Sequence, residues 1–269
     1  GSEALHSNRS VARILSEAAQ KHGVPEGAIQ FIDVTDRQAV TDLIRMKGLV
    51  DVVIPRGSAR LIQAVVENAT VPVIETGAGV CHTFVDESAD CDMARRIAFN
   101  AKVQRPSVCN AMETLLVHEK AAPTFLPAML KDYFEAGVQI FGCEKAQTFD
   151  KRVQSATEED WATEYGDLRL SLKIVHDLDE ALSHIACYGT RHSECIVTQD
   201  MNNARRFQAE VDAAVVYVNA STRFTDGFEF GFGAEIGIST QKLHARGPMA
   251  LPELTSYKYL INGSGQIRG

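Results

Sequence analysis

Several features that would assign this chain to a class of protein are missing from its sequence. It has no basic run longer than a few residues, and its 269 residues carry a formal net charge of −8. Neither nucleic acid nor an anionic membrane is a natural partner for such a surface. No stretch approaches the roughly 18 consecutive apolar residues of a membrane span, and the N-terminus lacks a basic-then-apolar signal pattern. We therefore expect a soluble, cytoplasmic protein.

Paired cysteines are missing as well, although the chain contains six cysteines. No two of them form a C-x-x-C motif, and His82, His118 and His244 are not spaced as metal ligands. We therefore predict neither a metal site nor a secreted disulfide framework, and we interpret these histidines as structural. Reduced thiols are expected at all six positions, which are Cys81, Cys91, Cys109, Cys143, Cys187 and Cys195.

The pattern that is present is an alternation of amphipathic and apolar segments. With 45% hydrophobic residues the chain can bury a substantial core, which we expect to form two lobes. In residues 1–74 the alternation is typical of a parallel sheet covered on both faces. Helices are expected near 8–22, 36–46 and 58–67, and strands at 29–33, 49–55 and 71–74. We interpret this region as the second half of a Rossmann-like domain, in the α/β fold class.

Residues 75–225 repeat the alternation and predict a second α/β lobe. Its apolar segments lie at 138–143, 170–175, 194–199 and 213–219. The remaining residues, 226–269, are glycine-rich and end in an alternating apolar segment at 256–263. That segment predicts an edge strand, which needs a partner or some other protection.

One cysteine lies in a setting suited to a nucleophile. Cys109 belongs to QRPSVCNAMETLLVH (104–118), where an amphipathic segment ends, a proline breaks it and a short apolar segment begins. An ordinary thiol has a pKa near 8.5, so only about 3% of it is thiolate at neutral pH. A turn that offers backbone N–H groups, with Arg105 nearby, could raise that fraction. The alternative is an inert packed thiol, because cysteine is among the most buried residue types.

The residues before Cys109 favour the first interpretation. VPVIETGAGVCHTFVDESADCD (71–92) predicts a strand, a glycine-rich turn with Glu75, a second strand and an acidic helix start, and Cys109 follows Glu75 by 34 residues. This arrangement resembles the aldehyde dehydrogenase superfamily, in which a glutamate before a glycine pair opens the catalytic domain and the nucleophilic cysteine follows at this distance. Within that superfamily the chain is similar to the gamma-glutamyl phosphate reductase family in five blocks: GSEALHSNR (1–9), VIPRGSARL (53–61), KVQRPSVCNAMETLLVH (102–118), TEYGDLRLSLKIV (163–175) and NASTRFTDGFEFGFGAEIGISTQKLHARGPMALPELTSYKY (219–259).

The resemblance implies an activity and a nucleophile. The implied reaction is NADPH-dependent reduction of L-glutamyl 5-phosphate to L-glutamate 5-semialdehyde with release of phosphate, in proline biosynthesis. Cys109 would form a thioester, with the backbone N–H of Cys109 or Asn110 as a donor to the oxyanion. Glu75 matches a glutamate that activates water in hydrolytic members, but a reductase gains nothing from that hydrolysis. Glu75 is therefore left either as a catalytic proton relay or as a cap of its turn.

Cofactor and substrate residues follow from the same resemblance. The implied cofactor-binding residues are Ser2, Glu3, Arg56, Gly57, Ser58 and Glu164. The turn at 56–58 opens a predicted helix and so offers N–H groups to a phosphate, although alone it would be an ordinary loop. Glu164 matches a carboxylate that reaches the nicotinamide-side ribose, and its alternative is a solvated carboxylate at a helix start.

The implied substrate-binding residues are Asn110, Ser221, Thr222 and Arg223. Arg223 is predicted to bind the substrate α-carboxylate, because a guanidinium offers two parallel donors. The alternative for this arginine is a surface charge in a glycine-flanked loop.

The resemblance also divides the chain. It implies the second half of an NADPH-binding domain at 1–74, a catalytic domain at 75–225 with the cleft at their boundary, and a segment at 226–269 that returns to the cofactor domain and supplies an oligomerisation strand. Family members carry a segment before GSEALHSN, so we expect a C-terminal portion that is inactive alone and binds NADPH about two or more orders of magnitude more weakly. A homo-oligomer is expected, with the glutamate 5-kinase that makes the substrate as a candidate partner. A hydrolytic aldehyde dehydrogenase and a folded fragment without activity remain alternatives.

Overall fold

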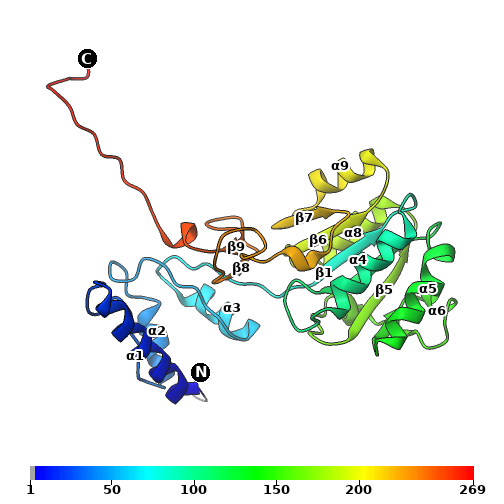
Figure 1. Ribbon diagram of the computed structural model, residues 1–269, viewed down its shortest axis with the longest axis horizontal. Helices are drawn as coiled ribbons and strands as arrows, with labels where there is room; N and C mark the ends of the chain where they lie inside the picture. The colour runs from blue at the N-terminus through cyan, green and yellow to red at the C-terminus, as the bar shows by residue number, and fades with distance from the viewer. Residues whose placement is uncertain (1–3) are drawn as a thin grey trace. The chain divides into compact units, whose positions relative to one another are not determined.

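The computed structural model describes residues 4–269, which separate into two compact units, 1–73 and 74–269 (Figure 1). The first unit contains the helices α1 (Leu5–Lys21), α2 (Arg37–Leu43) and α3 (Ala59–Asn68). Side-chain oxygens cap two of them, because Asp36 accepts from the Gln38 N–H and Ser58 accepts from the Leu61 N–H. In the part of the chain that the structure describes, no helix is both long and apolar enough to cross a membrane.

The three strands predicted for the first unit are not formed, so that prediction was wrong. Residues 29–33 contain no strand, and 49–55 meets 71–74 only at one isolated parallel bridge between Val53 and Val73. The Val53 N–H donates to the Pro72 carbonyl at 2.9 Å. Two segments without a third are marginal as a sheet, and the prolines at positions 55 and 72 each remove a backbone donor from them.

The second unit is built on a seven-stranded sheet in the order β4-β3-β5-β2-β1-β6-β7, with every neighbouring pair parallel. Helices cover both faces of its central strands, so these strands are buried along their whole length. Every residue of β1 and of β2 is buried. The strands are β1 (Cys81–Val85), β2 (Met112–His118), β3 (Gln139–Gly142), β4 (Gln154–Ser155), β5 (Arg169–Val175), β6 (Ser193–Val197) and β7 (Val215–Val218).

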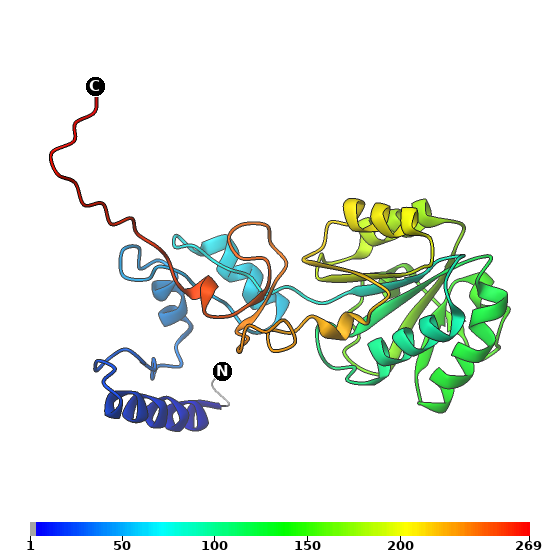
Figure 2. The same cartoon turned by 45° about the horizontal axis from the view of Figure 1, so that its top comes forward.

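Helices cover the two faces of this sheet and produce a three-layer unit, which Figure 2 shows most clearly. On one face α4 (Cys91–Val103) and α5 (Ala122–Glu135) bury a core that includes Phe125, Leu126 and Met129. On the other face α8 (Leu178–Tyr188) and α9 (Met201–Glu210) cover Phe84 of β1, and Phe207 of α9 belongs to the same core. The short helices α6 (Glu144–Gln147) and α7 (Glu158–Trp161) lie in the connections.

Aspartates begin three of these helices. Asp90, Asp177 and Asp200 are the N-caps of α4, α8 and α9, and each carboxylate accepts a backbone N–H of the first turn. The acidic helix start predicted before α4 is thus Asp90, which accepts from the Met93 N–H at 2.7 Å. This cap fixes the start of the helix whose far end leads to Cys109.

The C-terminal region differs from its prediction. An antiparallel pair, β8 (Gly237–Ser239) and β9 (Gly247–Met249), precedes a 3-10 helix at Pro252–Leu254. The edge strand predicted at 256–263 is wrong, because this segment has no assigned strand and its residues are exposed. Its alternating apolar pattern indicates what a strand would bury, but a strand also needs a neighbour, and the described residues provide none.

Candidate functional site

Cys109 lies in the loop that joins α4 to β2, residues 104–111, which we call the nucleophile loop. The helix ends at Val103, before Arg105 and Pro106, and the strand begins at Met112. Because the loop precedes β2, it lies at the amino edge of the parallel sheet. The Cys109 side chain is partly buried, and none of the six cysteines, all within the described residues, forms a disulfide.

A glycine makes room for the backbone of the nucleophile loop. A Cβ atom placed on Gly79 would lie 1.8 Å from the carbonyl oxygen of Cys109, so no larger residue fits at position 79 without displacing that carbonyl. Gly79 belongs to the glycine-rich turn that precedes β1. The sequence indicated a turn there, but only the structure connects the turn to Cys109.

A second cysteine holds the same carbonyl from inside the sheet. The Cys81 thiol, at the start of β1, donates to the Cys109 carbonyl oxygen at 3.2 Å. Burial, followed by the charge of Glu194, raises the pKa of Cys81 well above its usual value, so this thiol keeps the proton that it donates. The His192 Nδ1 lies 3.7 Å from the Cys81 sulfur and extends the contact to the start of β6.

The predicted substrate loop does lie against the nucleophile loop. The Asn110 amide donates to the Thr225 carbonyl at 2.8 Å, and the Thr222 hydroxyl donates to the Asn110 carbonyl at 2.7 Å. Ser221 caps the short 3-10 helix Thr222–Phe224 by accepting from the Arg223 N–H. Asn110, Ser221 and Thr222 are all buried, so these three side chains brace the loop more than they face solvent.

Arg223 is the cationic member of this cluster. Its Nη1 contacts the Asn110 amide oxygen, and its Nε donates to the Gln104 amide oxygen at 2.8 Å. Desolvation, and then the charge of Arg105, lower the pKa of Arg223 from its usual value. Arg105 lies within the nucleophile loop and Arg223 lies beside it, so two guanidinium groups make these surroundings favourable to an anion. Gln104 had no predicted role, and nothing in its local sequence indicated one.

Glu75 lies among a different set of residues. Its backbone N–H donates to the Gln241 amide oxygen at 2.8 Å. Glu75 also lines an open pocket. The other described residues that line it are Gly189, Thr190, Arg191, Thr240, Gln241 and Lys242, and Cys109 is not among them. Since Thr76 bridges Ser239 in β8, this turn is attached to the C-terminal hairpin.

Glu164 is exposed, and its loop rests on a buried ion pair that sequence reasoning missed. Lys102, in the last turn of α4, contacts Glu113 in β2 with Nζ and Oε2 2.6 Å apart. The other oxygen of Glu113 accepts the Gly166 N–H at 3.1 Å. Burial raises the pKa of Glu113 to about 7 against the opposing effect of Lys102, and the Glu164 charge adds to the rise. The only signal in the sequence was Glu113 at the start of the mainly apolar β2, because Lys102 lies in a helix that carries several other charges.

The remaining predicted cofactor residues belong to the first unit or precede the described residues. Ser58 is the N-cap of α3, so its hydroxyl oxygen is engaged by the Leu61 N–H at 3.3 Å. Gly57, between Arg56 and this cap, has φ +151°, and a Cβ atom there would lie 2.8 Å from a Leu61 methyl carbon. Ser2 and Glu3 lie outside the residues that the structure describes.

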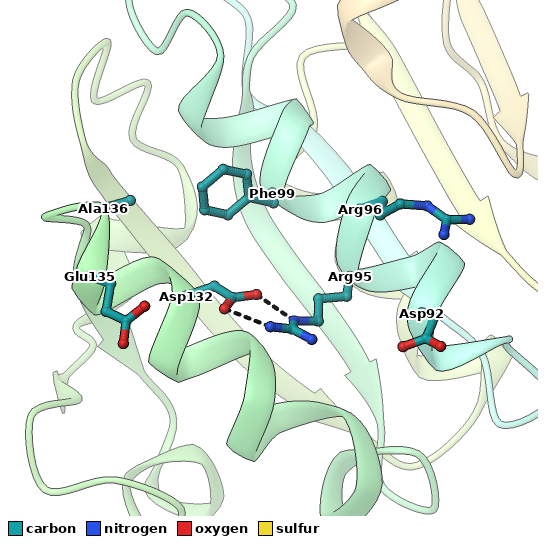
Figure 3. A pocket seen from close by; sticks show the side chains of 7 residues that line it. All are labelled: Asp92, Arg95, Arg96, Phe99, Asp132, Glu135 and Ala136. Atoms are coloured by element: carbon teal, nitrogen blue, oxygen red, sulfur yellow. Dashed lines mark hydrogen bonds and ion pairs between the residues drawn. The ribbon is translucent and has the colours of Figure 1, made fainter.

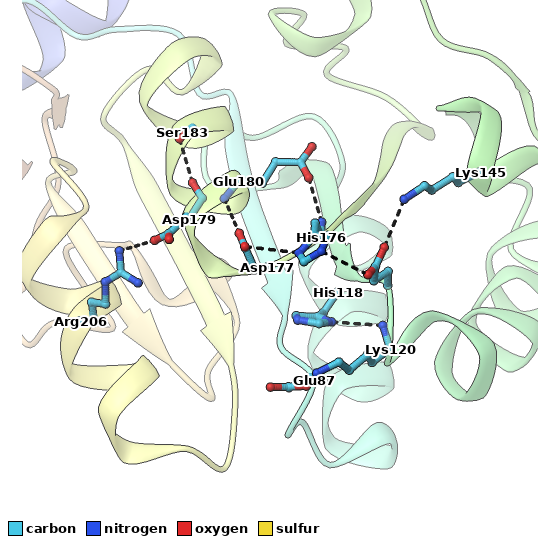
Figure 4. Close-up of polar contacts among 11 residues, drawn as sticks. Glu87, His118, Lys120, Lys145, His176, Asp177, Asp179, Glu180, Ser183 and Arg206 are labelled. Carbon is cyan, nitrogen blue, oxygen red and sulfur yellow. Dashed lines mark hydrogen bonds and ion pairs between the residues drawn. The ribbon is translucent and has the colours of Figure 1, made fainter.

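Two polar surfaces lie elsewhere on the second unit. Figure 3 shows a pocket between α4 and α5, where Arg95 forms an ion pair with Asp132 beside Phe99. Figure 4 shows a network at the carboxyl ends of β2 and β5, where the His118 Nδ1 accepts the Lys120 N–H at 3.1 Å. Within residues 4–269 no group of three or more His, Cys, Asp or Glu side chains is arranged to hold a metal ion.

Comparison with known proteins identifies related sequences over the whole chain. The model of the aldehyde dehydrogenase family matches residues 6–139. A gamma-glutamyl phosphate reductase of Caldanaerobacter subterraneus subsp. tengcongensis is 62% identical over 268 residues, and one of Moorella thermoacetica is 63% identical. Each match covers 100% of this chain, and the chain spans 65% and 64% of these two relatives.

Solved structures give the same result for the fold. The crystal structure of gamma-glutamyl phosphate reductase from Thermotoga maritima superposes with a TM-score of 0.96 at 52% identity, covering all of this chain and 65% of that one. An acetylating aldehyde dehydrogenase from Geobacillus thermoglucosidasius superposes with a TM-score of 0.72 at 19% identity over 97% of this chain, which shows a shared fold only.

Proposed function

We propose, from the premise that this chain belongs to the aldehyde dehydrogenase family, that Cys109 is the nucleophile of an enzyme that reduces L-glutamyl 5-phosphate to L-glutamate 5-semialdehyde with release of phosphate. The observation that carries the proposal is the fixed presentation of Cys109. Its carbonyl is held by the Cys81 thiol and lies against Gly79, with Arg105 in the same loop and Arg223 beside it. Names of close relatives supply the substrate, and the chain's own residues supply the chemistry.

The first step is an acyl transfer. The Cys109 thiolate forms a C–S bond with the C5 carbonyl carbon, and the C–O bond to the phosphate breaks with its electron pair leaving on phosphate. The Asn110 backbone N–H, which has no hydrogen-bond acceptor among the described residues, is available to the oxyanion of the tetrahedral intermediate. Arg105 and Arg223 favour both the thiolate and an anionic substrate at this place.

A nicotinamide cofactor, when bound, supplies the hydride that reduces the thioester to the aldehyde. The residues present fit such a group in two respects. The exposed carboxylate of Glu164 is suited to ribose hydroxyls, and its loop is fixed by the Glu113 bond to Gly166. The first turn of α3, capped by Ser58 after Gly57, leaves backbone N–H groups for a phosphate. NADPH as the specific cofactor is part of the proposal.

Arg223 is proposed to bind the α-carboxylate of the substrate, with Thr222, Ser221 and Asn110 holding the loop that presents it. Its contacts with Asn110 and Gln104 orient the guanidinium beside Cys109. Glu75 is proposed to stabilise its turn, because its backbone is bonded to Gln241 and a reductase needs no activated water. A role of Glu75 in proton relay is the alternative that the activity of Glu75→Gln would test.

Because the chain spans less than two thirds of its relatives, the activity of the whole protein remains a proposal together with its assembly. We retain as predictions a homo-oligomer, an encounter with glutamate 5-kinase, a role in proline biosynthesis and a cytoplasmic location. Native mass spectrometry of the protein with and without the kinase tests the first two.

Acylation tests the central claim without requiring cofactor. The protein is incubated with L-glutamate, ATP and glutamate 5-kinase, which generate the acyl phosphate in place, and the intact mass is then recorded. We expect one glutamyl group on wild type, removable by hydroxylamine and located on the Cys109 peptide. Cys109→Ala should carry no label while keeping its fold by circular dichroism.

Cys91→Ala is the matched control, because Cys91 begins α4 and is itself partly buried. It should be labelled within a few-fold of wild type. Label on Cys109→Ala, or none on wild type, would contradict the proposed nucleophile.

A further inference from the structure

We propose that Lys102 and Glu113 form a clamp that holds the nucleophile loop and the loop carrying Glu164 in a fixed relation to each other. The clamp is the ion pair between these two side chains, and the second loop, residues 163–168, is called the cofactor-side loop. Both residues are positioning residues in this account. The inference rests on the proposed function in one respect, that Cys109 is the nucleophile.

The first argument is where the pair lies in the chain. Lys102 is the last residue but one of α4, and Glu113 is the second residue of β2, so the pair spans the nucleophile loop at its two ends. With Nζ and Oε2 2.6 Å apart, the contact closes that loop at its base. Any opening of the base would move the turn that contains Cys109.

The second argument is that Glu113 has two engagements. One carboxylate oxygen meets Lys102, and the other accepts the Gly166 N–H at 3.1 Å. Lys102 also lies 6.0 Å from the centroid of the Tyr165 ring. Tyr165 is itself fixed, because its hydroxyl bonds to Asp160 at 2.8 Å and Ser171 at 3.0 Å. The cofactor-side loop is therefore docked on the same two side chains that close the nucleophile loop.

The third argument is the burial of the pair. The side chains of Lys102 and Glu113 are 0% and 1% exposed. Removing two charges from water costs several kcal/mol, and two apolar side chains of similar size would often stabilise a core as well or better. Packing alone therefore does not account for an ion pair at this position. A requirement to hold the two loops in one fixed orientation does account for it.

The charged groups that face the pair come from two elements. The cofactor-side loop contributes Glu164 and Asp167, and β5 contributes Arg169. Desolvation raises the pKa of Glu113 and lowers that of Lys102, so both charges are held against the preference of their surroundings. Their mutual contact, together with the Gly166 bond, offsets this cost.

The test separates position from stability with three variants of the protein. Lys102→Met/Glu113→Met removes both charges and fills the same space. Glu113→Gln keeps an oxygen for the Gly166 N–H and removes the charge opposite Lys102. Lys120→Met is the control, since it breaks a Lys–Glu contact of the same 2.6 Å length on the surface, with Glu87. Each variant is followed by thermal melting, by amide exchange of residues 162–168 and by iodoacetamide labelling of the Cys109 peptide.

The double variant should melt close to wild type, because it leaves no buried charge unpaired. Its cofactor-side loop should nevertheless exchange about tenfold faster or more, since the charge-assisted bond to Gly166 is gone. Cys109, now on a loosened loop, should be alkylated about tenfold faster. Lys120→Met should match wild type in all three measurements.

Rates of amide exchange and of Cys109 alkylation within about twofold of wild type, in a stable double variant, would overturn the clamp. Two methionines would then hold the loops as well as the ion pair does. If the double variant fails to fold, Glu113→Gln decides. We expect it to retain protection at Gly166 while Cys109 alkylation rises, and unchanged alkylation would overturn the inference. Failure of the acylation experiment described above would instead remove the proposed function and leave the alkylation result standing.

Discussion

At the scale of single residues, the site is defined by what surrounds each side chain. Cys109 and Cys81 are near neighbours with opposite assignments. Cys81 is fully buried beside Glu194, and the resulting rise in its pKa keeps it a thiol that donates to the Cys109 carbonyl. Cys109 is partly buried with arginines nearby. Cys81 therefore holds the loop, and Cys109 is the cysteine that we propose to react.

Arg223→Ala should weaken use of the substrate about ten- to a hundred-fold, because a charge-assisted contact with a carboxylate is worth roughly 1.5–3 kcal/mol. The effect should fall on KM more than on kcat. Steady-state kinetics of semialdehyde formation by the whole enzyme measures it.

Gln104→Ala is the matched control, since it removes the Nε partner of Arg223 at 2.8 Å and keeps the guanidinium. Its KM should change only a few-fold. Loss of NADPH affinity in Arg223→Ala, with substrate use unchanged, would mean that this loop serves the cofactor and not the substrate.

At the scale of elements, the sheet brings together three segments that are far apart in sequence. Gly79 and Cys81 precede and begin β1, the nucleophile loop precedes β2, and His192 precedes β6. Because β1 pairs with both β2 and β6 in parallel, all three amino ends lie on one edge. At the carboxyl ends of these strands, Asp86 follows β1. Its carboxylate accepts hydrogen bonds from the Ser88 and Thr198 hydroxyls and from the Asn203 amide.

Gly79→Ala should reduce acylation of Cys109 by about tenfold or more. The new methyl carbon would meet the Cys109 carbonyl oxygen at 1.8 Å, so the nucleophile loop has to move. Overpacking of this kind typically costs about 1–3 kcal/mol, and melting should fall accordingly. Intact-mass acylation and thermal melting measure the two effects.

The neighbouring residue provides the comparison for this substitution. Ala78 is exposed, so Ala78→Ser should leave both acylation and melting close to wild type. Normal acylation in Gly79→Ala would show that the carbonyl position does not matter to the reaction.

At the scale of the whole second unit, two buried histidines contribute to the response to acid. His184 and His192 are 3% and 0% exposed. Burial, with the charges of His82 and Lys173 adding at His184, lowers their pKa values to about 2 and about 4. Because both values are depressed, the unfolded chain binds more protons below pH 6.5, and stability falls as the pH drops.

Glu113 acts in the opposite direction, because its raised pKa makes the folded state bind the extra proton between about pH 4.5 and 7. On unfolding in acid, the two histidines take up more protons than the one glutamate releases. The net effect of these three groups is therefore a loss of stability in acid. Each proton that is bound in one state and not in the other changes the free energy of unfolding by about 1.4 kcal/mol per pH unit.

His184→Phe should remove one such proton, and the ring would still pack against Tyr188, whose centroid lies 4.6 Å from that of His184. We expect the stability difference between pH 7 and pH 5, from urea unfolding, to become smaller than in wild type. His176→Gln, at an imidazole 72% exposed, is the control and should leave that difference unchanged. An equal pH dependence in His184→Phe would contradict the buried neutral imidazole.

The sequence alone predicted the α/β class of the second unit, because mainly apolar segments such as 170–175 and 194–199 alternate with amphipathic ones. Its long motif blocks also indicated the resemblance to gamma-glutamyl phosphate reductases, and relatives of that name are 62% and 63% identical. Those signals are local, and each depends on residues within one segment or on their order.

Tertiary structure decided the rest, because pairing and proximity depend on distant residues. The strands predicted at 49–55 and 256–263 are not formed, since a strand requires a neighbour that no local pattern reveals. Gly79 beneath the Cys109 carbonyl, Arg223 against Asn110, and Lys102 opposite Glu113 are contacts made by folding. The sequence predicted Cys109 as a nucleophile, whereas only the packed sheet determined which side chains hold its loop.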